Sequence, residues 1–144
     1  MSFLVDLVDG LATLLDTEGV ATYRPTGIYT AAETAVTDTV MPDSPDRAVV
    51  LTAYDNTDDP ALTDCTVSVQ VRTRAGPDPR QVADLDEAVF TTLHALSDAQ
   101  FGTARVGLMK RDNSAPMGRD SNGRFERVSN YTIRAQRPPT DRLE

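Results

Sequence analysis

The sequence predicts an α+β two-layer sandwich, in which a four- to five-stranded, mostly antiparallel sheet carries two helices on one face. Two segments, near residues 3–16 and 79–96, repeat apolar residues with the period of an amphipathic helix. The other apolar segments alternate apolar and polar residues, as strands with one buried face do. Two helices cannot cover both faces of such a sheet. We therefore expect them together on one face, with the other face open to solvent or to a neighbouring subunit.

The first expected element is the helix over residues 3–16. Ser2 can cap its N-terminus and Gly19 can end it, although Gly10 in the middle disfavours a helix by about 1 kcal/mol relative to Ala. Its apolar side chains share one side: Phe3, Leu4, Leu7, Val8, Leu11, Leu14 and Leu15. After it we expect a strand at 20–24, an irregular or weakly extended segment at 26–46, a strand at 47–54 and an acidic loop at 55–64.

The strand over residues 65–74 has the clearest alternation in the chain. Cys65, Val67, Val69 and Val71 point one way, and Thr66, Ser68, Gln70, Arg72 and Arg74 the other. Gly76 and Pro77 then break the strand, and Asp78 and Pro79 can begin the second helix as its cap and first residue. That helix is expected to reach about Leu96, with a core stripe of Val82, Leu85, Val89, Leu93 and Leu96.

Two strands, at 104–111 and 125–136, are expected to form a hairpin. Turn-forming residues fill the intervening segment 112–123, which predicts a long projecting loop. Its candidate contact residues are Asp112, Pro116, Arg119, Asp120 and Asn122. Residues 138–144 begin with two prolines and predict an extended C-terminal arm after a single domain at 1–137.

The 144 residues carry a net charge of −8, which argues against a general nucleic-acid binder. The charge is unevenly divided. Residues 1–64 contain 12 acidic and 2 basic residues (−10), whereas residues 65–144 contain 10 acidic and 12 basic residues (+2). A molecule with one acidic side is therefore expected. The sequence contains neither a basic leader nor an apolar run of about 20 residues, so we expect a protein of the cytoplasm or of a larger particle, without membrane contact.

No catalytic template fits the sequence. Nucleophile-elbow and phosphate-binding glycine motifs are absent. Cys65 and His94 are the single residues of their types, which excludes a disulfide and a conventional His/Cys zinc site. A calcium loop counted from Asp55 has Pro60 where glycine is required. We therefore predict no catalytic residue, metal ion or cofactor.

Arginines on the polar faces of two strands are the strongest candidates for binding. Arg72 and Arg74 alternate with the valines of one strand, and Arg127 and Arg134 lie on the last strand. They can form a solvated face or a docking face for an acidic surface, including the acidic half of another copy. Nucleic acid is a weaker interpretation because few aromatic residues accompany them.

Several short sequence segments are similar to those of a known protein family. They are Gly10–Leu15, Tyr23-Arg24-Pro25, Ile28-Tyr29, Met41-Pro42, Pro45-Asp46-Arg47, Val49–Thr52, Val67–Arg74, Ala115–Asp120, Asn122-Gly123-Arg124 and Ser129-Asn130-Tyr131. In this order, over residues 3–137, the chain resembles the tail terminator or "minor capsid" (head–tail joining) proteins of long-tailed, siphovirus-type bacteriophages, especially those of actinobacterial hosts. Arginine supplies 13 of the 14 basic residues, which agrees with such a host.

The resemblance implies a structural α+β protein without enzymatic activity. Such proteins form a hexameric ring at the head-proximal end of the tail, assembled in the host cytoplasm. The ring ends polymerisation of the major tail tube protein, joins the neck or head-completion protein, and lets DNA pass without sequence-specific contact. In a ring, Arg72, Arg74, Arg127 and Arg134 would face a neighbouring protomer or the tube. The alternatives are another head–tail connector, a tail-tube subunit, a small metal-dependent enzyme at Asp55–Asp64, and a non-viral binding module.

Overall fold

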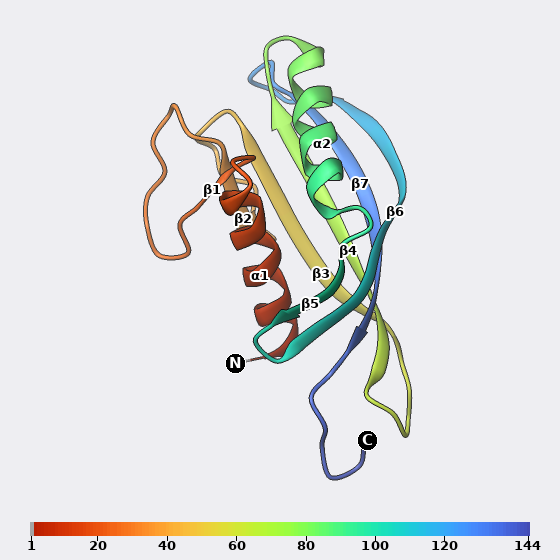
Figure 1. Ribbon diagram of the computed structural model, residues 1–144. Coiled ribbons are helices and arrows are strands. Elements are labelled where there is room, and N and C mark those ends of the chain that lie inside the picture. Colours follow the sequence, from red (N-terminus) through yellow and green to blue (C-terminus); the bar gives the residue numbers. More distant parts are fainter. Residues whose placement is uncertain (1) are drawn as a thin grey trace.

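One curved, seven-stranded sheet carries both helices on the same face in the computed structural model, which describes residues 2–144 (Figure 1). The elements are α1 (Phe3–Thr17), β1 (Thr22–Tyr23), β2 (Ala35–Asp38), β3 (Ala48–Asp58), β4 (Asp64–Ala75), α2 (Pro79–Leu93), β5 (Ser97–Phe101), β6 (Ala104–Arg119) and β7 (Phe125–Gln136). The strand order is β1-β2-β3-β4-β7-β6-β5. The predicted α+β class with two helices is thus confirmed.

The predicted sheet of four to five mostly antiparallel strands is wrong in strand number and in kind. The sheet has seven strands and is mixed, because β1, β2 and β3 pair in parallel. β2 and β5 were not expected as strands. Their sequences, AVTD and SDAQF, are too short to show alternation, and they form because a neighbouring strand offers its edge.

Two strands extend into segments that were expected to be loops. β3 continues to Asp58, and β6 continues to Arg119. Most of the added residues are polar and exposed, so hydrophobic alternation gives no signal for them. They pair because β4 and β7 continue alongside them and satisfy their backbone groups.

The expected residues set both ends of α1 and the start of α2. The Ser2 side chain accepts a hydrogen bond from the Val5 amide at 3.3 Å. Asp78 accepts from the Arg80 amide at 2.9 Å, and Pro79 occupies the first turn of α2. Gly19 follows α1 with a φ of 75°, a left-handed conformation that glycine adopts without strain. α2 ends at Leu93, three residues before the expected end.

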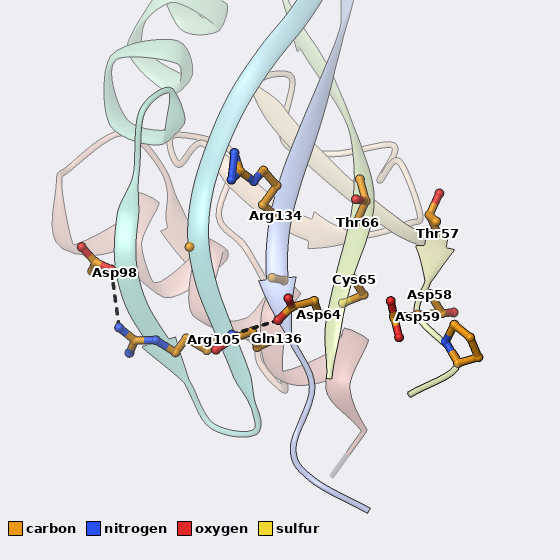
Figure 2. A pocket seen from close by; sticks show the side chains of 13 residues that line it. Thr57, Asp58, Asp59, Asp64, Cys65, Thr66, Asp98, Arg105, Arg134 and Gln136 are labelled. Atoms are coloured by element: carbon orange, nitrogen blue, oxygen red, sulfur yellow. Dashed lines mark hydrogen bonds and ion pairs between the residues drawn. The ribbon is translucent and has the colours of Figure 1, made fainter. Parts of the chain in front are cut away.

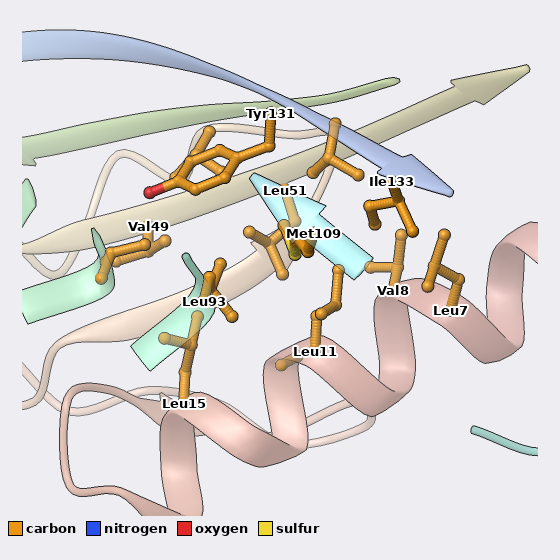
Figure 3. Close-up of a cluster of buried hydrophobic side chains, with 14 of the residues drawn as sticks. Leu7, Val8, Leu11, Leu15, Val49, Leu51, Leu93, Met109, Tyr131 and Ile133 are labelled. Carbon is orange, nitrogen blue, oxygen red and sulfur yellow. The ribbon is translucent and has the colours of Figure 1, made fainter. Parts of the chain in front are cut away.

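A single hydrophobic core lies between the helices and the sheet. Leu7, Leu11 and Leu15 of α1 point toward the sheet, where Leu51 and Ile133 are among the fully buried side chains (Figure 3). Gly10 lets β5 approach α1. A Cβ there would lie 2.1 Å from Cγ of Phe101, so the glycine that weakens the helix is required by the packing.

The C-terminal segment 138–144 contains no helix or strand, and it returns to the connection between β3 and β4. The Glu144 amide donates to the Ala61 carbonyl, and the Glu144 carbonyl accepts from the Thr63 amide, both at 3.0 Å. The division into a domain at 1–137 and an arm stays a prediction.

Candidate interaction surfaces

Because of the strand order, the acidic and the nearly neutral halves of the sequence form different sides of the sheet. β1–β3 and α1 come from residues 1–64, which carry −10; β1–β3 occupy one side of the sheet, and α1 packs across its helix face against these strands and against β5 and β6. β4, β7, β6 and α2 come from residues 65–144, which carry +2, and occupy the other side (Figure 1). The boundary falls between β3 and β4, where the charge balance changes.

The acidic side has carboxylates without a basic partner. Asp9 accepts a hydrogen bond from the Tyr23 hydroxyl at 2.9 Å, and Asp16 accepts from the Tyr23 amide at 2.8 Å. Burial, and then the bond to Asp9, raises the pKa of Tyr23 to about 12. Asp16 and Glu18 lie at the C-terminal end of α1, whose last turn has no basic residue. Within residues 2–144, neither forms an ion pair.

The four arginines predicted to line an interface do not lie together. Arg72 lies on the face away from the helices and pairs with Glu126 at 2.5 Å. Arg134 is exposed on the same face, and no carboxylate in the described part of the chain pairs with it. Arg127 lies on the helix face and donates to the Ser114 hydroxyl at 3.3 Å.

Arg74 is buried, with 3% of its surface exposed. Its guanidinium donates to the backbone carbonyls of Asp46 at 2.9 Å and Pro45 at 2.6 Å. Burial, together with nearby Arg124, lowers its pKa. Because these bonds hold the loop that precedes β3, we assign Arg74 a role in folding and propose no partner contact for it.

The long loop predicted at residues 112–123 is a strand followed by a tight turn. Asp112, Pro116 and Arg119 lie on β6, and Asp120 and Asn122 lie in the turn. The Asp120 carboxylate accepts from the amides of Asn122 and Arg124, both at 2.9 Å, and from the Arg124 side chain. These bonds lower the pKa of Asp120 and hold the turn rigid.

The second half of β6 forms an open edge of the sheet. β5 pairs with β6 as far as Leu108, the connection before β5 bonds the backbone of Met109, and no other strand within residues 2–144 pairs with the rest of that edge. Pro116 and two register shifts interrupt the edge. Such interruptions are typical of exposed strand edges, where they prevent pairing with strands of other molecules. Near its end, Met117 is 52% exposed, and Arg119 is exposed without a carboxylate partner in the described chain.

A buried carboxylate joins α2 to the hairpin. Asp86 is 4% exposed and accepts hydrogen bonds from the hydroxyls of Ser129 at 2.7 Å and Ser114 at 3.0 Å. The guanidinium groups of Arg111 and Arg127 lie 3.5 and 3.6 Å from it. This cluster supports the fold, and it explains why Arg127 points toward the helices.

The acidic segment 55–64 is occupied by contacts within the chain. Asp59 accepts from the amides of Ala61 and Leu62, both at 2.8 Å, which lowers its pKa. Asp64 accepts from Gln136 at 3.0 Å, and Arg137 pairs with Asp58 at 3.3 Å and with Asp55. Nowhere in residues 2–144 do three His, Cys, Asp or Glu side chains gather as metal ligands would.

A groove of about 540 Å³ lies beside this segment (Figure 2). Asp98 and Arg105 on β5 and β6 approach to 3.5 Å at one side of it, and Arg134 points from β7. Cys65 is buried in its wall, and burial raises the pKa of the thiol. A thiol in that state is a poor nucleophile. His94 instead stacks on Phe90 and accepts from the Arg111 amide at 3.0 Å.

One strongly exposed apolar residue was not among the predicted contact residues. Ile28 is 92% exposed in the loop between β1 and β2. The loop is fixed at its base, where Arg24 pairs with Glu33 at 2.5 Å and the Tyr29 hydroxyl donates to the Val36 carbonyl at 2.6 Å. The sequence signal was an isoleucine, next to Gly27 and Tyr29, in a segment without apolar alternation.

Comparison with known proteins gives the chain a family. Residues 14–137, most of the chain, match the model of the bacteriophage tail terminator protein family. No curated protein sequence matches the chain. A solved chain from the virion of a native gene transfer agent particle shares the fold, with a TM-score of 0.57 and 14% identity over 88% of this chain and 84% of that one. In the described residues, no helix is long and apolar enough to cross a membrane. With its predicted resemblance confirmed over most of its length, the chain belongs to the bacteriophage tail terminator family.

Proposed function

We propose that this protein caps the head-proximal end of a phage tail tube as a hexameric ring, ends polymerisation of the tube, and joins the tail to the neck. The family match over residues 14–137 carries the proposal. Tail terminators are structural virion proteins, so the chain is a structural tail protein, and the prediction that it is not an enzyme is confirmed through its family.

The arrangement of charge supports assembly into a ring. A closed ring of identical subunits requires two different surfaces on each subunit that fit each other. This chain has an acidic side formed by α1 and β1–β3 and an opposite side on which Arg119 and Arg134 are exposed. Surfaces of opposite charge determine which side meets which.

The partners follow from the proposed position. One face of the ring would contact the major tail tube protein and the other the neck or head-completion protein, while DNA passes through without sequence-specific contact. The excess of negative charge agrees with a channel that does not retain DNA. The fixed loop that exposes Ile28 is suited to contact one of these partners.

Electron microscopy of the protein with purified tail tubes tests the proposal. We expect a single layer of density at one tube end and no further elongation when tube subunits are added. Long polymers of the protein alone would identify a tube subunit, and binding to the neck without binding to tubes would identify another connector. Charge reversal at Arg134 is the suitable interface variant, because reversal at Arg74 would disrupt folding.

A further inference from the structure

We propose that the end of β6 in one copy docks against α1 of a second copy, with Arg119 facing the acidic C-terminal end of that helix and Met117 facing the groove beside it. The inference rests on the proposed function, since it names a contact within the ring. Its occupant is a second copy of this chain.

The accepting surface is a groove of about 460 Å³ between α1 and the turn that joins β5 to β6. Its wall is mainly apolar at Gly10, Leu14 and Phe101, with Asp9 and Thr13 also lining it, and the ring of Phe101 lies directly against Gly10. The groove follows α1 as far as Thr17, and the next residue, Glu18, is exposed. An apolar groove thus ends beside exposed carboxylates.

The C-terminal end of α1 would be stabilised by a positive charge, and the helix provides none there. The C-terminus of a helix carries a partial negative charge, and each nearby carboxylate is unfavourable there, whereas each cation is favourable. Asp16 and Glu18 are both acidic, and the last turn of α1 has no basic residue. A guanidinium from outside the chain would therefore be attracted to this position.

The end of β6 offers the matching groups. Met117 is half exposed, and Arg119, two residues later, has no carboxylate partner within residues 2–144. The strand edge on which both lie is not paired with another strand there. The apolar side chain of Met117 can enter the apolar groove, while the guanidinium of Arg119 lies near the unpaired carboxylates at its end.

A single chain cannot bring these groups together. Met117 and Arg119 lie at the far end of β6, a strand of 16 residues that rises about 3.3 Å per residue, whereas the groove lies beside the turn from which β6 starts. A neighbour placed head to tail presents its β6 edge to the α1 side, and the same contact repeats around a closed ring. Complementary charge therefore favours a second copy as the occupant.

Charge exchange between Arg119 and Glu18 tests the contact. Self-association of the wild type, Arg119→Glu, Glu18→Arg and the double variant is measured by native mass spectrometry, alone and with tail tubes. We expect each single reversal to raise the protein concentration at which half of the protein is assembled by about tenfold or more. In the double variant, we expect this concentration to return most of the way to the wild-type value. Arg142→Glu is the control, because it makes the same change on an exposed arginine of the C-terminal segment.

The outcomes separate this inference from the proposed function. Glu18→Arg removes an unfavourable charge from the helix end, so its Tm should not fall while assembly weakens. If wild-type rings form and the single reversals leave them unchanged, or the double variant is no better than the singles, the docking contact is wrong and the capping function stands. If the wild type forms no ring, even on tubes, both the contact and the ring are overturned.

Discussion

Replacing Asp86 by Ala removes the carboxylate that joins α2 to β6 and β7. The variant loses two hydrogen bonds, from Ser129 at 2.7 Å and Ser114 at 3.0 Å. Bonds to a charged group contribute about 1.5–3 kcal/mol each. It also leaves the cations of Arg111 and Arg127 without their carboxylate, but their side chains are 24% and 25% exposed and can turn toward water. We expect a loss of about 3–4 kcal/mol in the free energy of unfolding.

Urea and thermal unfolding followed by circular dichroism measure this loss. A loss of that size lowers the Tm by about 10 °C, at roughly 3 °C per kcal/mol for a chain of this length. Asp84→Ala is the matched control, because Asp84 is exposed on the same helix and forms no ion pair with a described residue. A loss below about 1 kcal/mol for Asp86→Ala would refute the view that the cluster holds α2 on the sheet.

Three further predictions follow from local geometry. Gly10→Ala should destabilise the fold by about 1–3 kcal/mol in urea unfolding, because its Cβ would collide with Phe101; a more stable variant would contradict the close approach. The pKa of Glu33 is lowered to about 2 by its bond to Arg24, so the stabilisation is present above the ordinary carboxyl pKa and is lost as the pH falls through about 2. Loop amide signals in NMR spectra should thus persist at pH 3, and their loss already at pH 4 would disprove the pairing. Cys65 should react with a thiol reagent only after denaturation, and rapid labelling of the native protein would show that it is not buried.

The sequence predicted elements well where their stability comes from their own apolar pattern. α1, β4 and β7 match within one residue at each end, since each buries a regular stripe or alternating face. β2 and β5 have no such pattern, and their pairing depends on strands that come later in the chain or on a neighbouring edge. Non-local partners of this kind are not visible in a window of residues.

The alternation of residues along β7 already distinguishes two of the arginines predicted for the interface. Arg127 shares its parity with Tyr131 and Ile133, which face the core, whereas Arg134 has the opposite parity. The period of two therefore places Arg127 on the helix face from sequence alone. The burial of Arg74 is different. It depends on the loop at residues 39–47, whose path over the strand is determined by tertiary contacts.

The two edges of the sheet differ in a way that favours head-to-tail contact. At the β1 edge, the amides of Tyr23 and Arg24 already donate to Asp16 and to the Tyr29 hydroxyl, so little backbone is left for pairing. At the β6 edge, the connection before β5 occupies the backbone of Met109 and the amide of Arg111, but the backbone beyond Arg111 lacks a strand partner among the described residues, and Arg119 is exposed. A two-fold contact through the α1 side would place carboxylates against carboxylates, which is unfavourable. A heterologous contact joins two different surfaces, here the end of β6 and the groove beside α1, so carboxylates do not meet carboxylates. It closes into a ring when the rotation between neighbours is a whole fraction of a turn.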